Sequence, residues 1–163
     1  MGKSINKIII VTGIGIVVLA APAHTGRNAD RVNSDPHFVD VGIIALIESG
    51  NFNYAYNAIE QACGPHQIRQ CVIDDYNTKG PGRARPLALS DMYDDFLSEH
   101  VADWYINVQI PKYIRHYKIK DHVNARIVAY NAGIKALKDR RIPPITRAYM
   151  AVYHDILNNR DTE

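Results

Sequence analysis

Apolar residues recur every three or four positions through most of the chain after residue 35, and this spacing restricts the fold more than any other feature. Side chains at such intervals share one face of an α-helix, so each stripe predicts a helix with one buried face. The stripes are formed by Val39, Ile43, Leu46 and Ile47; by Met92, Phe96, Leu97, Val101, Trp104 and Val108; by Val123, Ile127 and Val128; and by Tyr149, Met150, Tyr153 and Leu157. Clear alternation with a period of two is missing, so we expect a mainly α single domain, with room for a short β-hairpin between Asn51 and Gln67.

Capping residues and helix breakers divide these stripes into elements. Helix starts are predicted at Asp35 with Pro36, at Ser90 with Asp91, at Asp121 and at Thr146. Gly50 and Asn51 end the first helix, which places Glu48 in its last turn. Residues 68–76 predict a short helix, and Pro111 must kink or restart the longest one, because proline cannot donate the helical hydrogen bond.

Residues 1–23 have the layout of a secretory signal peptide. Residues 1–7 are cationic, residues 8–21 are apolar and uncharged, and the sequence Ala-Pro-Ala at residues 21–23 fits a cleavage site between small residues. The alternative is a retained membrane anchor, but as a helix the apolar run rises only about 21 Å, against roughly 30 Å for the hydrocarbon core. We expect cleavage after Ala23, a polar flexible segment at residues 24–34, and one domain at residues 35–163.

Composition and charge agree with a single exported globular domain. The chain has 163 residues, of which 47% are hydrophobic and 22% charged, and this excludes a disordered or collagen-like protein. Lys3 and Lys7 account for the formal charge of +2, so 17 basic and 17 acidic residues remain after the signal peptide. A nucleic-acid-binding protein needs an excess of positive charge, so that class has no support. We expect the protein to act in the periplasm or outside the cell.

The two cysteines, Cys63 and Cys71, are close in sequence. In an oxidising compartment such a pair can form a disulfide that closes a short loop, and the alternative is a pair of buried free thiols. Two cysteines alone do not make a zinc site, and no histidine, His66 included, completes a recognised ligand spacing. We therefore expect no metal and no other cofactor.

Glu48 is the candidate catalytic residue. It directly follows the apolar residues 43–47 and lies beside the C-terminus of a predicted helix. Burial and the negative end of the helix dipole both disfavour a carboxylate, so both raise its pKa. A carboxyl group that stays protonated near neutral pH is suited to general acid catalysis. From position alone, the alternative is a surface glutamate at the end of a helix.

Four short motifs follow one another along the chain in an informative order. They are I-E-S-G at residues 47–50, G-P-H-Q-I at 64–68, A-Y-N-A-G at 129–133 and I-P-P-I-T-R-A-Y at 142–149. Over about residues 36–155 the series resembles the soluble-type (SLT) lytic transglycosylases, relatives of goose-type lysozyme. That family has E-S-G at a helix end, then G-L-M-Q-I, A-Y-N-A-G and P-x-T-R-x-Y. One short motif is weak, but four in this order are specific together.

The resemblance implies a lysozyme-like fold of the SLT or goose type and assigns roles by position. Glu48 would be the single catalytic acid and base. The residues expected to orient it or to contact the substrate are Ser49, Gln67, Tyr130, Asn131 and Tyr149. Taken singly, each of these has a structural alternative, such as a turn cap for Gln67 or a core edge for the tyrosines. Pro65 and His66 replace the usual Leu-Met, which implies a more polar wall of the substrate subsite.

The implied activity is cleavage of the β-1,4 bond between N-acetylmuramic acid and N-acetylglucosamine in peptidoglycan. Glu48 would protonate the leaving oxygen, the substrate's own acetamido group would stabilise the cation, and the Glu48 carboxylate would deprotonate the muramyl 6-hydroxyl to close a 1,6-anhydro ring. This outcome needs neither water nor a metal. The expected partner is the glycan strand, bound by a monomer that serves wall recycling, a secretion or conjugation machine, or phage lysis or infection.

Two other functions remain open on the sequence. One is a hydrolytic, lysozyme-type muramidase in which a second carboxylate, from Asp74, Asp75, Asp91 or Asp94, positions a water molecule. The other is a non-catalytic peptidoglycan-binding or assembly protein that retains the groove.

Overall fold

The computed structural model describes residues 8–12, 15–19 and 35–160, the first two stretches by their backbone alone. Within the predicted signal peptide, β1 (Ile8–Thr12) pairs antiparallel with β2 (Gly15–Leu19), with Ile10 opposite Val17. The predicted cleavage site at residues 21–23 and the predicted flexible segment at residues 24–34 lie outside the described residues. Export by a cleaved signal peptide stays a prediction.

Residues 35–160 are mainly helical, as the sequence predicts, with 63% helix and 5% strand. The α-helices described are α2 (Val41–Ser49), α3 (Gln70–Lys79), α4 (Asp95–Trp104), α5 (Ile110–His116), α6 (Val123–Asn131), α7 (Ile134–Lys138) and α8 (Pro144–Arg160). Short 3-10 helices η1 (Pro81–Arg83) and η2 (Leu89–Tyr93) and a π-helical segment η3 (Tyr105–Gln109) join them. A small antiparallel sheet of β3 (Tyr56–Asn57), β4 (Ala62–Cys63) and β5 (Ile68–Arg69) contains the hairpin expected between Asn51 and Gln67.

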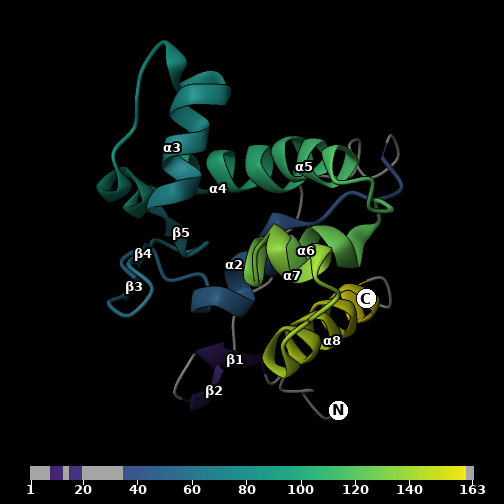
Figure 1. Ribbon diagram of the computed structural model, residues 1–163. Coiled ribbons are helices and arrows are strands. Elements are labelled where there is room, and N and C mark those ends of the chain that lie inside the picture. Colours follow the sequence, from purple (N-terminus) through teal and green to yellow (C-terminus); the bar gives the residue numbers. More distant parts are fainter. Residues whose placement is uncertain (1–7, 13–14, 20–34, 161–163) are drawn as a thin grey trace.

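Helix α2 lies at the centre of the helices, with the small sheet beside it and α8 along its other side (Figure 1). Its side chains Val41, Ile43, Ile44 and Ile47 are 0–1% exposed. Full burial of one such side chain contributes about 1.5–3 kcal/mol to stability, so α2 is held firmly by its neighbours. The C-terminal end of α2 is therefore a rigid base for a functional side chain.

The first helix begins later than the sequence predicts. Asp35 and Pro36 form a turn, in which the Asp35 carboxylate accepts the His37 N–H at 2.8 Å and also binds Arg126. The N-cap of α2 is Asp40 instead, whose carboxylate accepts the Gly42 N–H at 2.8 Å. An ion pair with a distant part of the chain thus replaces the predicted cap.

The longest predicted helix also begins later, and it changes its winding on the way. Asp94 caps α4 by accepting the Leu97 N–H at 2.9 Å, while Asp91 caps the short η2. The π-helical segment η3 then leads into α5, in whose first turn Pro111 lies. Because proline lacks the N–H that a helix interior needs, the wider winding before it fits the predicted kink or restart. In Figure 1, α4 and α5 form one row across the molecule.

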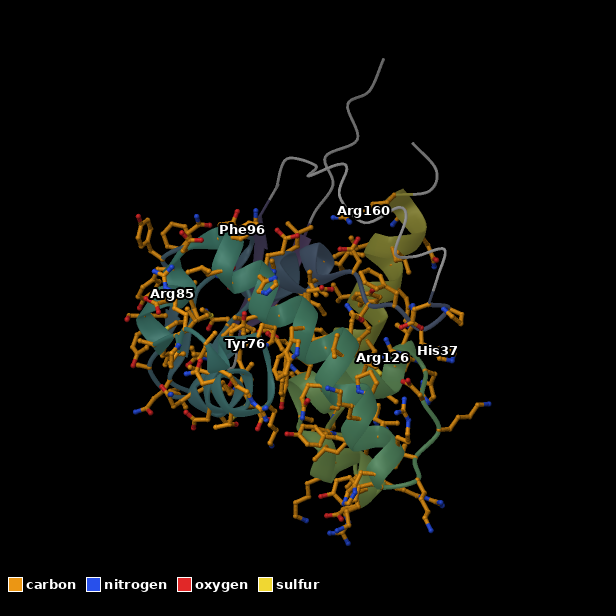
Figure 2. All side chains as sticks on the ribbon, turned by 90° about the horizontal axis from the view of Figure 1, so that it is seen from above. His37, Tyr76, Arg85, Phe96, Arg126 and Arg160 are labelled. Atoms are coloured by element: carbon orange, nitrogen blue, oxygen red, sulfur yellow. The ribbon has the colours of Figure 1, made fainter. Side chains whose placement is uncertain are left out.

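The remaining helices differ from the prediction in detail. His122, not Asp121, caps α6, because the Asp121 carboxylate makes two hydrogen bonds to Arg126 at 2.9 and 3.0 Å. Arg126 is only 3% exposed, and Figure 2 shows it near His37, at the opposite side of the molecule from Phe96 and Arg85. Helix α8 begins at Pro144 rather than Thr146, and residues 68–76 divide into strand β5 and helix α3.

The disulfide that the sequence allows is not formed in the structure. Cys63 is buried on β4, and its Sγ lies 3.7 Å from the Tyr93 hydroxyl. Cys71 is exposed in the first turn of α3. Because one thiol packs inward against Tyr93 and the other is exposed to solvent, the prediction of a disulfide is corrected to two free thiols, of which only one is buried.

A tight turn at residues 64–67 connects β4 with β5, and only glycine fits at its start. Gly64 has a φ of +76°, a conformation that favours glycine. A Cβ added there would lie 1.9 Å from the main-chain oxygen of Met92. The turn is therefore pressed directly against η2, which fixes its position relative to the end of α2.

Gly64→Ala should lower the free energy of unfolding by clearly more than Gly133→Ala. At both positions φ is positive, +76° and +83°, a conformation that strains an alanine by about 1–3 kcal/mol. Only at position 64 does the added Cβ collide with the main chain, since nothing lies within 4 Å of it at position 133. Urea denaturation of both variants measures the difference, and equal losses would contradict this account of the turn.

Candidate active site

The candidate site begins where α2 ends. Gly50 adopts the left-handed conformation with a φ of 66°, and its N–H donates to the Leu46 main-chain oxygen at 3.0 Å. The Asn51 N–H also turns back, to the Ala45 oxygen at 3.1 Å. These bonds satisfy carbonyl groups at the helix end and stop the helix there. Glu48 therefore lies in the last turn of α2, where the sequence predicts it.

The turn at residues 64–67 packs against this helix end. The Ser49 hydroxyl donates to the Pro65 main-chain oxygen at 2.8 Å and accepts the Phe52 N–H at 3.0 Å. Gln67 has a φ of +50°, and both its main-chain N–H and its side-chain amide donate to the Gly64 oxygen, at 3.1 and 2.9 Å. Ser49 thus joins the helix to the turn, and the Gln67 side chain is held in one orientation.

Two tyrosines from distant helices meet Glu48. The Tyr130 hydroxyl, from the end of α6, donates to the His66 main-chain oxygen. Tyr149, from α8, is 2% exposed, and its hydroxyl makes no regular hydrogen bond within the described part of the chain, although it interacts with the Glu48 carboxylate. The structure therefore brings Glu48, Tyr130 and Tyr149 together from three separate helices.

Asn131 and His66 have other contacts. The Asn131 side-chain oxygen accepts the Thr146 hydroxyl at 2.7 Å, so that this residue joins α6 to α8. His66 is 2% exposed, and its Nδ1 lies 2.9 Å from the Ser98 hydroxyl. Neither Pro65 nor His66 lines the pocket beside Glu48.

A small pocket opens beside Glu48 and encloses about 260 Å³, part of it open to solvent. Its lining consists of Glu48, Gln67, Arg69, Val72 and Tyr130. Three of the predicted site residues, Glu48, Gln67 and Tyr130, therefore share one pocket, while Ser49, Asn131 and Tyr149 do not line it. The lining offers a carboxyl, an amide, a guanidinium and a phenol around a small space that is partly open to solvent.

Burial sets the protonation of Glu48. Its side chain keeps some access to the pocket, but surrounding protein removes most hydration from the carboxyl, and this desolvation raises its pKa from 4.5 to about 7. Interaction with the Tyr149 hydroxyl and the charge of Arg69 oppose the rise, while the charge of Glu60 adds to it. Near neutral pH the group is therefore close to half protonated and can both donate and accept a proton.

Arg69, Val72 and Glu60 belong to the surroundings of Glu48 but are not predicted from the sequence. Arg69 and Val72 line the pocket, and Glu60, in the turn between β3 and β4, forms an ion pair with Arg69. Ile68 and Arg69 form the short strand β5, and alternation turns Arg69 away from the side on which Ile68 is buried. The sequence predicts a helix over residues 68–76, and a helix does not give this alternation.

The four aspartates proposed as a second catalytic carboxylate are engaged elsewhere. Asp74 accepts a hydrogen bond from Gln70 at 2.9 Å, and Asp75 binds Lys79 at 2.7 Å and Tyr113. Asp91 and Asp94 cap η2 and α4. Glu60 is the carboxylate whose charge acts on Glu48.

Within residues 35–160 and the two N-terminal strands, no group of three or more His, Cys, Asp or Glu side chains is arranged to hold a metal ion. None of the helices in the same residues combines the length and the apolar character needed to cross a membrane. Comparison with known proteins finds no matching family model, no matching curated protein and no matching solved structure.

Glu48→Gln should make the protein more stable above pH 7 and leave its stability little changed below pH 4.5. The folded state holds the Glu48 proton up to about pH 7, whereas the unfolded chain loses it near 4.5. Stability therefore falls as pH rises between these values, by about 3 kcal/mol in total, and stays lowered above them. Glutamine carries no charge at any pH and avoids this loss.

Thermal unfolding of wild type and Glu48→Gln at pH 4.5, 6 and 8 measures the effect. Glu99→Gln, on α4 outside the pocket, is the matched control and should follow wild type. A Glu48→Gln variant that loses stability with pH as steeply as wild type would show that the carboxyl is well hydrated.

Proposed function

We propose that the protein is a peptidoglycan lytic transglycosylase with a lysozyme-like fold of the SLT type. The observation that carries the proposal is a single carboxyl, Glu48, whose pKa is raised to about 7 by desolvation in a pocket that it shares with Gln67 and Tyr130. An acid at the end of a buried helix, followed by a small antiparallel sheet, supports the lysozyme-like assignment. So does the order of the four sequence motifs.

The reaction uses Glu48 twice. The protonated carboxyl gives its proton to the glycosidic oxygen as the bond from that oxygen to C1 of N-acetylmuramic acid breaks. The acetamido oxygen of the same sugar stabilises the positive charge at C1. The Glu48 carboxylate then takes the proton of the 6-hydroxyl, whose oxygen bonds to C1 and closes the 1,6-anhydro ring. Glu48 ends protonated, and no water is consumed.

The surroundings of Glu48 support both steps. Desolvation makes the carboxylate formed in the first step a base with a pKa of about 7, strong enough to accept the hydroxyl proton in the second. The Tyr149 hydroxyl, which has no other regular partner in the described part of the chain, stabilises the charged form. Gln67 and Tyr130 are held by main-chain oxygens of the turn at residues 64–67, so both are oriented before substrate binds.

The hydrolytic alternative needs a second carboxylate that positions water. The four aspartates that the sequence offers for this role each bind another group, as a helix cap, in an ion pair or in a side-chain hydrogen bond. Their engagement favours the lyase, which needs no second carboxylate. Glu60 is the remaining candidate, since its charge acts on Glu48. Glu60 also forms an ion pair with Arg69 of the pocket, which makes it the residue to substitute when the two reactions are compared.

Glu48→Gln should lower the cleavage of purified sacculi by about 10²–10⁴-fold, because the amide cannot donate a proton. Wild-type kcat/KM should fall as pH rises through about 7, since Glu48 then loses its proton. Turbidity loss gives the rates, and mass spectrometry gives the products, which should be one water lighter than hydrolysed fragments.

Three outcomes of this experiment have distinct meanings. Fully hydrated products, together with a large loss in Glu60→Gln, would identify the hydrolase instead. Equal biological effect of wild type and Glu48→Gln, without cleavage by either, would identify a non-catalytic binding protein. Glu99→Gln controls for the chemical change and should retain wild-type rates.

Exposed aromatic rings beside the site also suit a glycan. Phe52 and Tyr54 are 60% and 73% exposed, and their ring centroids lie 6.2 Å apart. Tyr54 also contacts Tyr93, at 6.1 Å. We call these three residues the aromatic rim; it adjoins the site because the Phe52 N–H donates to Ser49. Flat rings with hydroxyl ends suit the mixed apolar and polar faces of sugars.

Tyr54→Ala should weaken binding to insoluble peptidoglycan by about tenfold, the effect of losing one well-placed contact of about 1.4 kcal/mol. The Glu48→Gln background prevents cleavage during the measurement. Tyr117→Ala, which removes a 41% exposed tyrosine after α5, is the matched control. Co-sedimentation with sacculi gives the affinities, and equal effects of the two substitutions would argue against a role of the rim.

A further inference from the structure

Arg69 places a fixed positive charge in the pocket beside Glu48. It follows the fully buried Ile68 on β5, so strand alternation directs its side chain to the opposite side, where it lines the pocket. Its charge acts on the Glu48 carboxyl and on the Tyr130 phenol. Neither step of the proposed reaction uses this guanidinium, and none of the four sequence motifs requires it.

The present partner of Arg69 is easily exchanged. Its Nη2 contacts an Oε2 of Glu60, and the two side chains are 38% and 49% exposed. Exposed ion pairs are weak, because water stabilises both charges when they separate. Glu60 lies in the turn between β3 and β4, at the edge of the small sheet. The guanidinium can therefore leave Glu60, or share it, when another anion enters the pocket.

We propose that Arg69 binds a carboxylate of the substrate next to the cleaved bond, and that it selects glycans carrying such a group over uncharged ones. The proposal rests on the proposed function, because it places the sugar chain in the same pocket. A guanidinium recognises a carboxylate through two parallel N–H···O bonds, which fixes both distance and orientation. In a muramyl glycan without its stem peptide, that carboxylate belongs to the lactyl group on the sugar whose C1 reacts.

Such binding also favours the acid form of Glu48. The charged groups that act on Glu48 are Arg69, which favours its carboxylate, and Glu60, which disfavours it. A substrate carboxylate on Arg69 would neutralise the favourable charge and add a second negative one nearby. Glu48 would then hold its proton more firmly when the correct substrate is bound than when the pocket is empty.

The experiment compares two forms of one substrate. Glycan strands freed of their stem peptides carry free lactyl carboxylates, and the same strands with these groups converted to primary amides carry no charge. Wild type should show a KM about tenfold lower for the charged strands. Arg69→Gln should lose this preference, Arg69→Lys should keep part of it, and Glu60→Gln, which frees the guanidinium, should keep it or increase it.

The outcomes separate this inference from the proposed function. Cleavage of neither form by wild type would overturn the proposed function. Cleavage of both forms with equal KM, or a preference that survives in Arg69→Gln, would overturn the role of Arg69 alone. The pH profile gives a second readout. On the charged strands, wild-type kcat should begin to fall at a higher pH than kcat/KM, because kcat reports the pKa of Glu48 with substrate bound and kcat/KM reports it in the free enzyme. Arg69→Gln should bring the two pH values closer together.

Discussion

The carboxyl of Glu48 loses most of its hydration at the end of a helix that is itself buried, and the other features of the site depend on this. Helix α2 is fixed by side chains that are almost fully buried, so its last turn cannot move to expose the acid. The left-handed Gly50 ends the helix directly after Ser49. A raised pKa here is therefore a consequence of packing, since the charges of Arg69 and Glu60 act in opposite directions.

The sequence was sufficient to predict the parts of the site that depend on local chemistry. Gly50 and Asn51 predict the helix end and hence the place of Glu48. The meeting of Glu48 with Tyr130 and Tyr149 follows from no local rule, because three helices contribute these residues. The resemblance of the motifs predicted that meeting. It did not predict that Asn131 would bind Thr146 or that His66 would turn toward Ser98.

Two of the wrong helix starts, those at Asp35 and Asp121, have one physical origin. At Asp35 and Asp121 the sequence predicts an N-cap, but both carboxylates bind the buried Arg126 instead. A later residue then caps each helix: Asp40 caps α2, and His122 caps α6. A buried guanidinium needs charged partners, and this need outweighs a local capping preference worth about 1 kcal/mol. Since Arg126 lies 91 positions from Asp35, local patterns cannot show the competition.

Two basic side chains, His66 and Arg69, belong to the turn and the strand that follow one another beside the end of α2. Burial lowers the pKa of His66 to about 4, so this residue is neutral near pH 7, and its Nδ1 lies 2.9 Å from the Ser98 hydroxyl. Arg69, by contrast, lines the pocket and has Glu60 as a counter-charge. In the proposed function a substrate carboxylate would neutralise this positive charge, and Glu48 would then hold its proton most firmly with that substrate bound.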